Sequence, residues 1–404
     1  MSALTPRQER ILLAAGLALI LAVVFSLVFE RRSFAAINRG DFPAFYTLAL
    51  LASEDNAYRF YDLERQREIQ NSVWPSLSGT VLPAAYPAYL AFFIRPLALL
   101  DADTARVVWV GLMLGCVVAA ARVLSRSVPS LWGLGWQIGI AIFLFWPLFV
   151  GVVGGQMVGL SFLCYAVLFA LDKRRIRPAE MAAGVVAGIW MVKPHFGLGV
   201  AALFLVERRW VALSAWFVMS LLLWLLGAVV AGPDWVGAWV VFARHFSEID
   251  LATNAYQMTG VIGALYSLVA SLGLGGKVSA EQWDKFSLAL ALLVPVGLLL
   301  ASRASKRDSR FVNAPLLSLG PLLVLFAPVV NFYDLSIALV PLIVLMKPSV
   351  QRDVLIAASV LCASQLVGLG KSLSVPGLAF VVALGMSILC WKAVVREARS
   401  ERAV

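Results

Sequence analysis

An aspartate follows the first hydrophobic segment of the sequence, within the motif GDFPAFY at residues 40–46. A carboxylate held among aromatic rings at a bilayer surface is costly unless it has a partner or a task. Such a carboxylate can act as a general base that takes the proton from an attacking hydroxyl group. Asp41 is therefore the first catalytic candidate. The alternative is that Asp41 caps a helix beginning at Phe42 or Pro43.

A lysine interrupts the long apolar stretch 180–206, directly before a proline and a histidine. A lysine in apolar surroundings needs an anion to offset its desolvation, so Lys193 is the leading candidate to bind an anionic group. The alternative is that its stem packs while its ammonium group reaches the membrane surface. No spacing typical of a metal site occurs, so we expect a metal-free reaction with no cofactor.

Three further side chains could bind an anionic group, namely His195, Arg244 and His245. Arginine offers a bidentate fork to phosphate, and histidine can donate a hydrogen bond near neutral pH. For Arg244 and His245 the alternative is the polar face of an amphipathic segment at 235–246.

Several aromatic and polar residues could contact a ligand at the same place. They are Phe42, Phe45, Tyr46, Tyr86, Gln156, Asn331 and Tyr333. Gln156 and Tyr333 could equally form hydrogen bonds between helices. Asp334 is interpreted as the N-cap of a helix starting at Leu335.

The composition identifies the class of protein that positions these residues. Of the 404 residues, 61% are hydrophobic and 14% are charged, whereas a soluble domain has about 25% charged residues. The sequence therefore predicts an all-α polytopic membrane protein. The net charge of +10 arises from basic clusters in particular loops, which favours anionic lipid as a partner and argues against nucleic acid. The four cysteines lie in apolar runs and are interpreted as packing residues.

The basic clusters predict the topology, because each is expected on the cytoplasmic side. We expect about twelve transmembrane helices, both termini inside, a single domain over 1–404 and one large outer loop at 31–102. Full spans are expected at 11–29, 103–122, 132–150, 157–171, 211–231, 284–302, 314–330, 334–346, 352–370 and 376–394. The 27 residues of 180–206 are expected to form two short helices broken near Lys193, and 86–100 and 257–272 are expected to be re-entrant or surface helices. This topology gathers the candidate residues on the outer side.

An ordered set of motifs resembles a known family. The set comprises DFPAFY, AYPAYLAFFIRPLALL, VVGGQMVGL, GIWMVKPHFGL followed by ERRW, and PVVNFYDLSIALVPL. Together they resemble the bacterial glycosyltransferases of family 87, in the GT-C superfamily. The resemblance implies a GT-C fold in the cytoplasmic membrane with its active site on the periplasmic or extracellular side. It also implies transfer of mannose or a pentofuranose from a polyprenyl-phosphate donor to a lipid or glycan acceptor, with Asp41 as the base. In such a transfer Lys193, His195, Arg244 and His245 are expected to bind the donor phosphate, and the aromatic and polar residues named above are expected to contact the sugar or the acceptor. Re-entrant helices at 84–100 and 257–272 are expected to wall the donor's prenyl tail.

Other classes of protein fit the pattern less well. A transporter or flippase of lipid-linked sugars is the main alternative, but repeat symmetry and charged residues at the midplane are not seen in the sequence. A membrane acyltransferase would need a histidine facing the cytoplasm, and a non-catalytic scaffold would not explain the clustered outer groups. The sugar, the acceptor, the linkage and the oligomeric state stay open.

Overall fold

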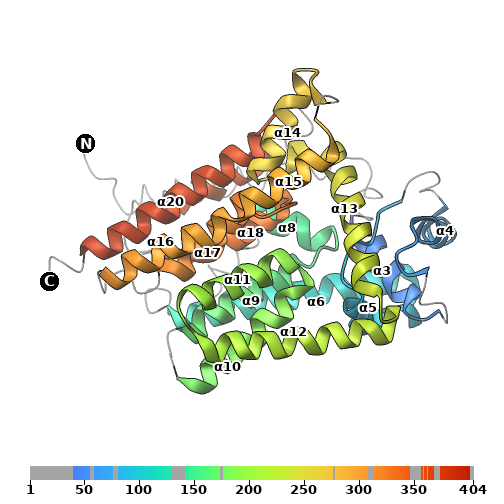
Figure 1. Cartoon of the computed structure of the whole chain (residues 1–404), viewed down its shortest axis with the longest axis horizontal. Coiled ribbons are helices and arrows are strands. Elements are labelled where there is room, and N and C mark those ends of the chain that lie inside the picture. Colours follow the sequence, from blue (N-terminus) through green and yellow to red (C-terminus); the bar gives the residue numbers. More distant parts are fainter. Residues whose placement is uncertain are drawn as a thin grey trace, which may run out of the picture.

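The chain forms a helical bundle in the computed structural model (Figure 1). The structure describes residues 40–54, 59–75, 81–128, 142, 144–172, 176–275, 278–307, 314–345, 356–357, 359–361, 363–367 and 374–400. Within these ranges no residue belongs to a named β-strand, and the one bridge joins Met258 to Asn331. The expected span 11–29 lies outside the described residues, as do most of 132–145 and parts of 352–370.

Three described helices are long and apolar enough to cross a membrane, namely Ala102–Ser127, Trp210–Ala231 and Glu281–Ser305. They correspond to α6 (Ala102–Ser127), α12 (Trp210–Ala231) and the consecutive helices α15 (Ala280–Ala291) and α16 (Leu293–Arg307). Large apolar side chains such as Val107 and Val229 are more than 70% exposed on these helices. Exposed apolar surface of this kind is what a helix presents to lipid, so the protein is an integral membrane protein.

The other described helices range from 3 to 23 residues in length. They are α3 (Phe42–Leu51), α4 (Leu63–Val73), α5 (Tyr89–Ile94), η3 (Arg95–Leu99), α8 (Trp146–Val153), α9 (Val158–Asp172), α10 (Arg177–Ile189), η5 (Trp190–Val192), α11 (Pro194–Val206), α13 (Trp235–Asn254), η6 (Ala255–Gln257), α14 (Val261–Ser271), α17 (Ala314–Phe326), η9 (Phe332–Leu335), α18 (Ser336–Leu345) and α20 (Leu378–Ser400). At about 1.5 Å per residue, the 10 residues of α18 are too few to cross a bilayer alone. The twelve expected spans are therefore only partly reproduced among the described residues.

The expected break in the apolar stretch 180–206 is confirmed. Helix α10 ends at Ile189, a short turn follows, and α11 begins at Pro194. Proline fits the first position of a helix because it has no N–H to leave unpaired there. Residue 193 takes an extended backbone conformation, which turns the chain between the two helices. The break places Lys193 at the N-cap position of α11.

A buried arginine holds together three helix ends remote from this break. Arg209 lies just before α12 and donates to Asp172 at the end of α9, at 2.6 Å, and to Glu180 in α10, at 2.9 Å. Only 6% of its side chain is exposed. A buried cation needs such paired carboxylates, so this ion-pair network fixes the α9–α10–α12 packing that supports the break.

Candidate active site

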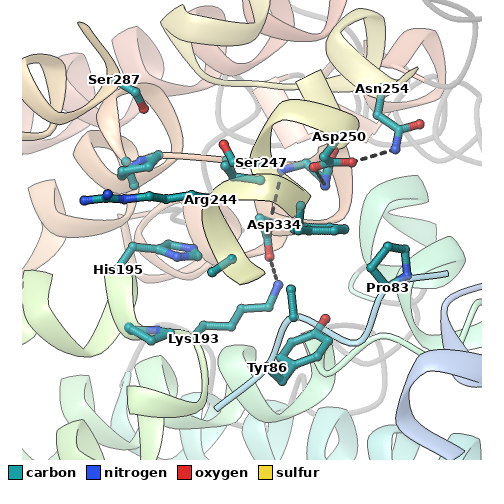
Figure 2. A pocket seen from close by; sticks show the side chains of 18 of the residues that line it. Pro83, Tyr86, Lys193, His195, Arg244, Ser247, Asp250, Asn254, Ser287 and Asp334 are labelled. Carbon is teal, nitrogen blue, oxygen red and sulfur yellow. Dashed lines mark hydrogen bonds and ion pairs between the residues drawn. The ribbon is translucent and has the colours of Figure 1, made fainter. Parts of the chain in front are cut away.

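A cavity of about 1270 Å³ opens among the segments 40–44, 81–87 and 327–334 and the helices α11, α13, α15 and α17. Figure 2 shows side chains from several of these elements pointing into it. The cavity walls include eight of the residues chosen from the sequence: Asp41, Tyr86, Gln156, Lys193, His195, Arg244, Asn331 and Tyr333. Segments almost 300 residues apart in the chain therefore meet at one site.

Backbone packing of glycines fixes Asp41 at this cavity. The Asp41 N–H donates to the Gly154 carbonyl at 2.8 Å, so the loop before α3 lies directly on the turn after α8. A Cβ on Gly40 would lie 2.1 Å from the Gly154 carbonyl oxygen, and Gly40 has a φ of +40°. Only glycine combines this close approach with a positive φ. The GDF and GGQ motifs thus interlock, which brings Asp41 beside Gln156.

Gln156 holds the Asp41 carboxylate. Its side-chain amide donates to Asp41 Oδ2, and its Oε1 accepts a hydrogen bond of 3.1 Å from the Tyr86 hydroxyl. Asp41 occupies the N-cap position of α3 but makes no side-chain capping bond. The capping alternative is therefore not what the carboxylate does here. The Tyr86–Gln156–Asp41 chain of hydrogen bonds instead orients it toward the cavity.

Burial raises the pKa of Asp41 above its ordinary value. Desolvation is the largest cause, and the negative charges of Asp250 and Asp334 raise the pKa further, while Gln156 and Lys193 lower it. A carboxylate with a raised pKa is a stronger proton acceptor, because it binds a proton more tightly.

We expect this raised pKa to appear in the pH dependence of activity. A general base works only when deprotonated, so the rate should fall as the pH drops through the pKa of Asp41. The acidic limb of the pH–rate profile should therefore lie at a higher pH than the ordinary aspartate pKa of about 3.9. Gln156→Leu should move the limb to still higher pH, because it removes a hydrogen bond that lowers the pKa. A pH–rate profile of both proteins checks this, and an unmoved limb would contradict Asp41 as the titrating group.

Lys193 is buried and paired. It forms an ion pair with Asp334, and the two side chains are 6% and 3% exposed. Its ammonium nitrogen also lies 4.9 Å from the centre of the Tyr333 ring. Figure 2 shows the Lys193 side chain pointing at Asp334, which lines the same cavity. The snorkelling alternative is wrong for this conformation, because the ammonium group faces an internal carboxylate and not the membrane surface.

Asp334 serves the site more directly than the sequence indicated. Asn331 is the N-cap residue of η9, and α18 begins at Ser336, so Asp334 is not the cap of a helix starting at Leu335. Its Oδ2 accepts a hydrogen bond of 3.3 Å from the Asn331 N–H, and its Oδ1 accepts from Lys193. Asp334 therefore both shapes the turn and neutralises Lys193.

The two histidines lie in different surroundings. His195 lines the cavity, with its ring centre 4.2 Å from that of Phe196, and its Nε2 is buried without a hydrogen-bond partner among the described residues. His245 is 60% exposed and does not line the cavity, and its Nδ1 lies 3.7 Å from Oε2 of Glu248. Arg244, the residue before it, does line the cavity. Of this pair on α13, therefore, Arg244 faces the cavity and His245 faces solvent.

Three aromatic candidates lie in the core and not on the cavity wall. Phe42, Phe45 and Tyr46 are at most 5% exposed. The Phe45 ring centre is 5.0 Å from that of Trp109, and the Tyr46 hydroxyl donates to the Leu100 carbonyl at 2.7 Å. Nearly every side chain of α3 is buried, so its rings pack against neighbouring helices. The structure therefore does not support their placement as sugar contacts, because these side chains pack in the core and do not line the cavity.

Two buried glutamines, which the sequence analysis did not select, hold the segment that carries Tyr86. Residues 81–87, here called the strap, line the cavity. Gln70 of α4 exchanges two hydrogen bonds with the Leu82 backbone, at 2.8 and 2.9 Å, and Gln66 accepts from the Ala84 N–H at 2.9 Å. Residues four apart on a helix rise about 6 Å, close to the spacing of alternate residues in an extended chain. The two side chains therefore pair with the strap as a neighbouring strand would.

Asp250 is an acidic residue of the cavity that was not expected from the sequence. It lies in α13, lines the cavity and is 3% exposed. Its carboxylate accepts hydrogen bonds from the side-chain amides of Asn254, at 2.6 Å, and Asn331, at 3.1 Å. The expected amphipathic segment ended at residue 246, but α13 continues to Asn254. The signal in the sequence was the Asp250–Asn254 spacing, which places both side chains on one helix face.

The comparisons with known proteins identify the family of the chain. The model of glycosyltransferase family 87 matches residues 84–328, which include Tyr86, Gln156 and Lys193 and exclude Asp41. No curated protein and no solved structure matches the chain. Among the described residues, no three His, Cys, Asp or Glu side chains are grouped as a metal site requires. Because the family model covers well over half of the chain, this protein belongs to glycosyltransferase family 87 and is a membrane glycosyltransferase.

Proposed function

We propose that the protein transfers a sugar, mannose or a pentofuranose, from a polyprenyl-phosphate donor to a hydroxyl group of a lipid or glycan acceptor. The observation that carries this proposal is the shared cavity, which is lined both by the carboxylate of Asp41 and by the buried lysine Lys193. Such a reaction needs both a proton acceptor and a cation for the leaving phosphate.

The proposed reaction uses these groups in one displacement. Asp41 takes the proton from the acceptor hydroxyl group, and the oxygen of that hydroxyl group attacks the anomeric carbon of the sugar. The new glycosidic bond forms as the bond between that carbon and the phosphate oxygen breaks, and the electron pair leaves with the polyprenyl phosphate. Charge grows on the phosphate, where Lys193 stabilises it. His195, whose buried Nε2 has no described partner, and Arg244 are further phosphate contacts in this proposal.

An apolar part of the cavity supports a lipid-linked donor. Its walls include Leu198 and Ala202 of α11, Leu288 of α15, and Val294 and Pro295 near the start of α16. Leu198 and Leu288 are 51% and 60% exposed, so this side reaches the lipid-facing surface. The sequence suggested walls at 84–100 and 257–272 for the prenyl tail. Only the edges of those segments line the cavity, and the α11–α15–α16 side is the better path.

The proposed function is tested by transfer assays in lipid nanodiscs. The purified protein is incubated with radiolabelled polyprenyl-phosphate mannose or arabinofuranose and a panel of glycolipid acceptors, with the Asp41→Asn protein as the blank. The proposal requires labelled product from at least one donor. Product formed equally from a nucleotide sugar, or binding of lipid-linked sugar followed only by its translocation, would contradict the proposed reaction.

We further propose that the cavity opens on the periplasmic or extracellular side, with the basic loops and both termini in the cytoplasm. In a variant without native cysteines, cysteine at Ser53 or Ser247 should react with a membrane-impermeant thiol reagent added to intact cells. Cysteine at Ser305, next to the basic residues 306 and 307, should react only after the membrane is opened. Labelling of the Ser305 variant in intact cells would invert the proposed orientation.

A further inference from the structure

Asp250 is fixed at the cavity wall by two amide groups from different parts of the chain. Asn254 lies one turn further along α13 and donates to Oδ1, whereas Asn331, 81 residues away, donates to Oδ2. Each carboxylate oxygen therefore has its own amide donor, and the plane of the carboxylate is set by both. Figure 2 shows Asp250 beside Asn254 at the upper part of the cavity, with Asp334 and Lys193 below.

The neighbouring Tyr333 extends this arrangement. Its hydroxyl oxygen accepts a hydrogen bond of 3.3 Å from the same Asn331 amide that contacts Asp250. A phenolic hydroxyl that accepts one hydrogen bond still carries its own proton to donate. Carboxylate, amide and phenol thus form a continuous row of acceptors and donors along one wall. Groups of this kind, few and rigidly placed, determine the orientation of a ligand in a pocket.

The row lies next to the groups that the proposed reaction uses. The Lys193 ammonium nitrogen is 4.9 Å from the centre of the Tyr333 ring, and Asp250 and Asp41 are close enough for their charges to interact. A sugar whose phosphate contacts Lys193 and whose anomeric carbon faces Asp41 would therefore place its ring hydroxyls against this wall.

We infer that Asp250, with Asn331 and Tyr333, recognises hydroxyl groups of the transferred sugar, and that Asp250 is a specificity-determining residue. This inference rests on the proposed function. A site built to hydrogen-bond a substrate hydroxyl discriminates strongly against analogues that lack it, because the protein groups are then left unpaired. Asp250 would accordingly contribute to binding of the sugar and not to binding of the lipid phosphate.

The alternative is that Asp250 only links α13 to the segment around Asn331. A link of that kind would affect every ligand of the cavity alike. Affinities of the wild-type and Asp250→Asn proteins should therefore be measured for two probes, polyprenyl phosphate and polyprenyl-phosphate sugar. We expect Asp250→Asn to weaken binding of the sugar-bearing probe by about tenfold to a hundredfold, which is the effect of losing a charged hydrogen bond. Binding of polyprenyl phosphate, which has no sugar, should change by less than about twofold.

Two additions make the experiment decisive. Glu281→Gln is the matched control, because Glu281 also lines the cavity but its side chain is 76% exposed. A series of donors each lacking one sugar hydroxyl should include one that the wild type binds weakly and for which Asp250→Asn causes no further loss. Equal weakening of both probes, or a loss that adds fully for every deoxy donor, would overturn the role of Asp250. Failure of the wild type to bind either lipid would instead overturn the proposed function.

Discussion

Replacing Asp41 by asparagine should abolish sugar transfer while leaving the donor bound. Asparagine keeps the shape of the side chain and can still contact Gln156, but it cannot take a proton from the acceptor hydroxyl. Loss of a general base costs on the order of a hundredfold or more in rate. The measurement is the single-turnover rate of transfer, together with the affinity for the donor.

The matched control for this variant is Asp103→Asn, which removes an exposed carboxylate in the first turn of α6. It should leave the rate unchanged. If the Asp41→Asn protein keeps more than about a third of the wild-type rate, far above the expected residual activity, the base lies elsewhere.

Replacing Lys193 by methionine should have two separable effects. The first is on folding, because Asp334 would remain buried without its cation, a change that costs about 3–5 kcal/mol. The double variant Lys193→Met with Asp334→Asn should recover most of that loss, since it leaves no uncompensated charge. Unfolding transitions of the three proteins in detergent measure this.

The second effect is on binding of polyprenyl phosphate, which both Lys193→Met proteins should lose to a similar degree. Asp334→Asn alone should bind it at least as tightly as the wild type, because the competing internal carboxylate is gone. The role of Lys193 in phosphate binding would be contradicted if the double variant, with its fold recovered, bound polyprenyl phosphate as the wild type does.

The sequence predicted which segments form the site better than it predicted what each side chain contacts. Asp41, Gln156 and Lys193 stand out because polar residues in apolar surroundings are conspicuous, and the structure brings all three to one cavity. Hydropathy does not reveal the partner of a buried ion, so the Lys193–Asp334 pair was not foreseen. That pair joins residues 141 positions apart, and only the folded chain brings them together.

Burial of aromatic residues was the other part that the sequence could not decide. Phe42 follows Asp41 directly and Phe45 lies four positions after it, which suggested contact with the same ligand, yet both rings are buried in the core and neither lines the cavity. Conversely, Gln66 and Gln70 lie in a helix rich in charged residues, where nothing in the sequence pattern indicates burial. Their amide groups are buried because the strap supplies backbone partners that water would otherwise provide.

The central claim is that one cavity holds a lipid-linked sugar between Asp41 and Lys193. The most direct measurement is a structure of the Asp41→Asn protein in a nanodisc with a polyprenyl-phosphate sugar bound. The account predicts the phosphate at Lys193 in place of Asp334, the sugar between that lysine and residue 41, and the prenyl tail between α11 and α15–α16. A donor whose phosphate is bound away from Lys193, with its sugar out of reach of residue 41, would contradict the account.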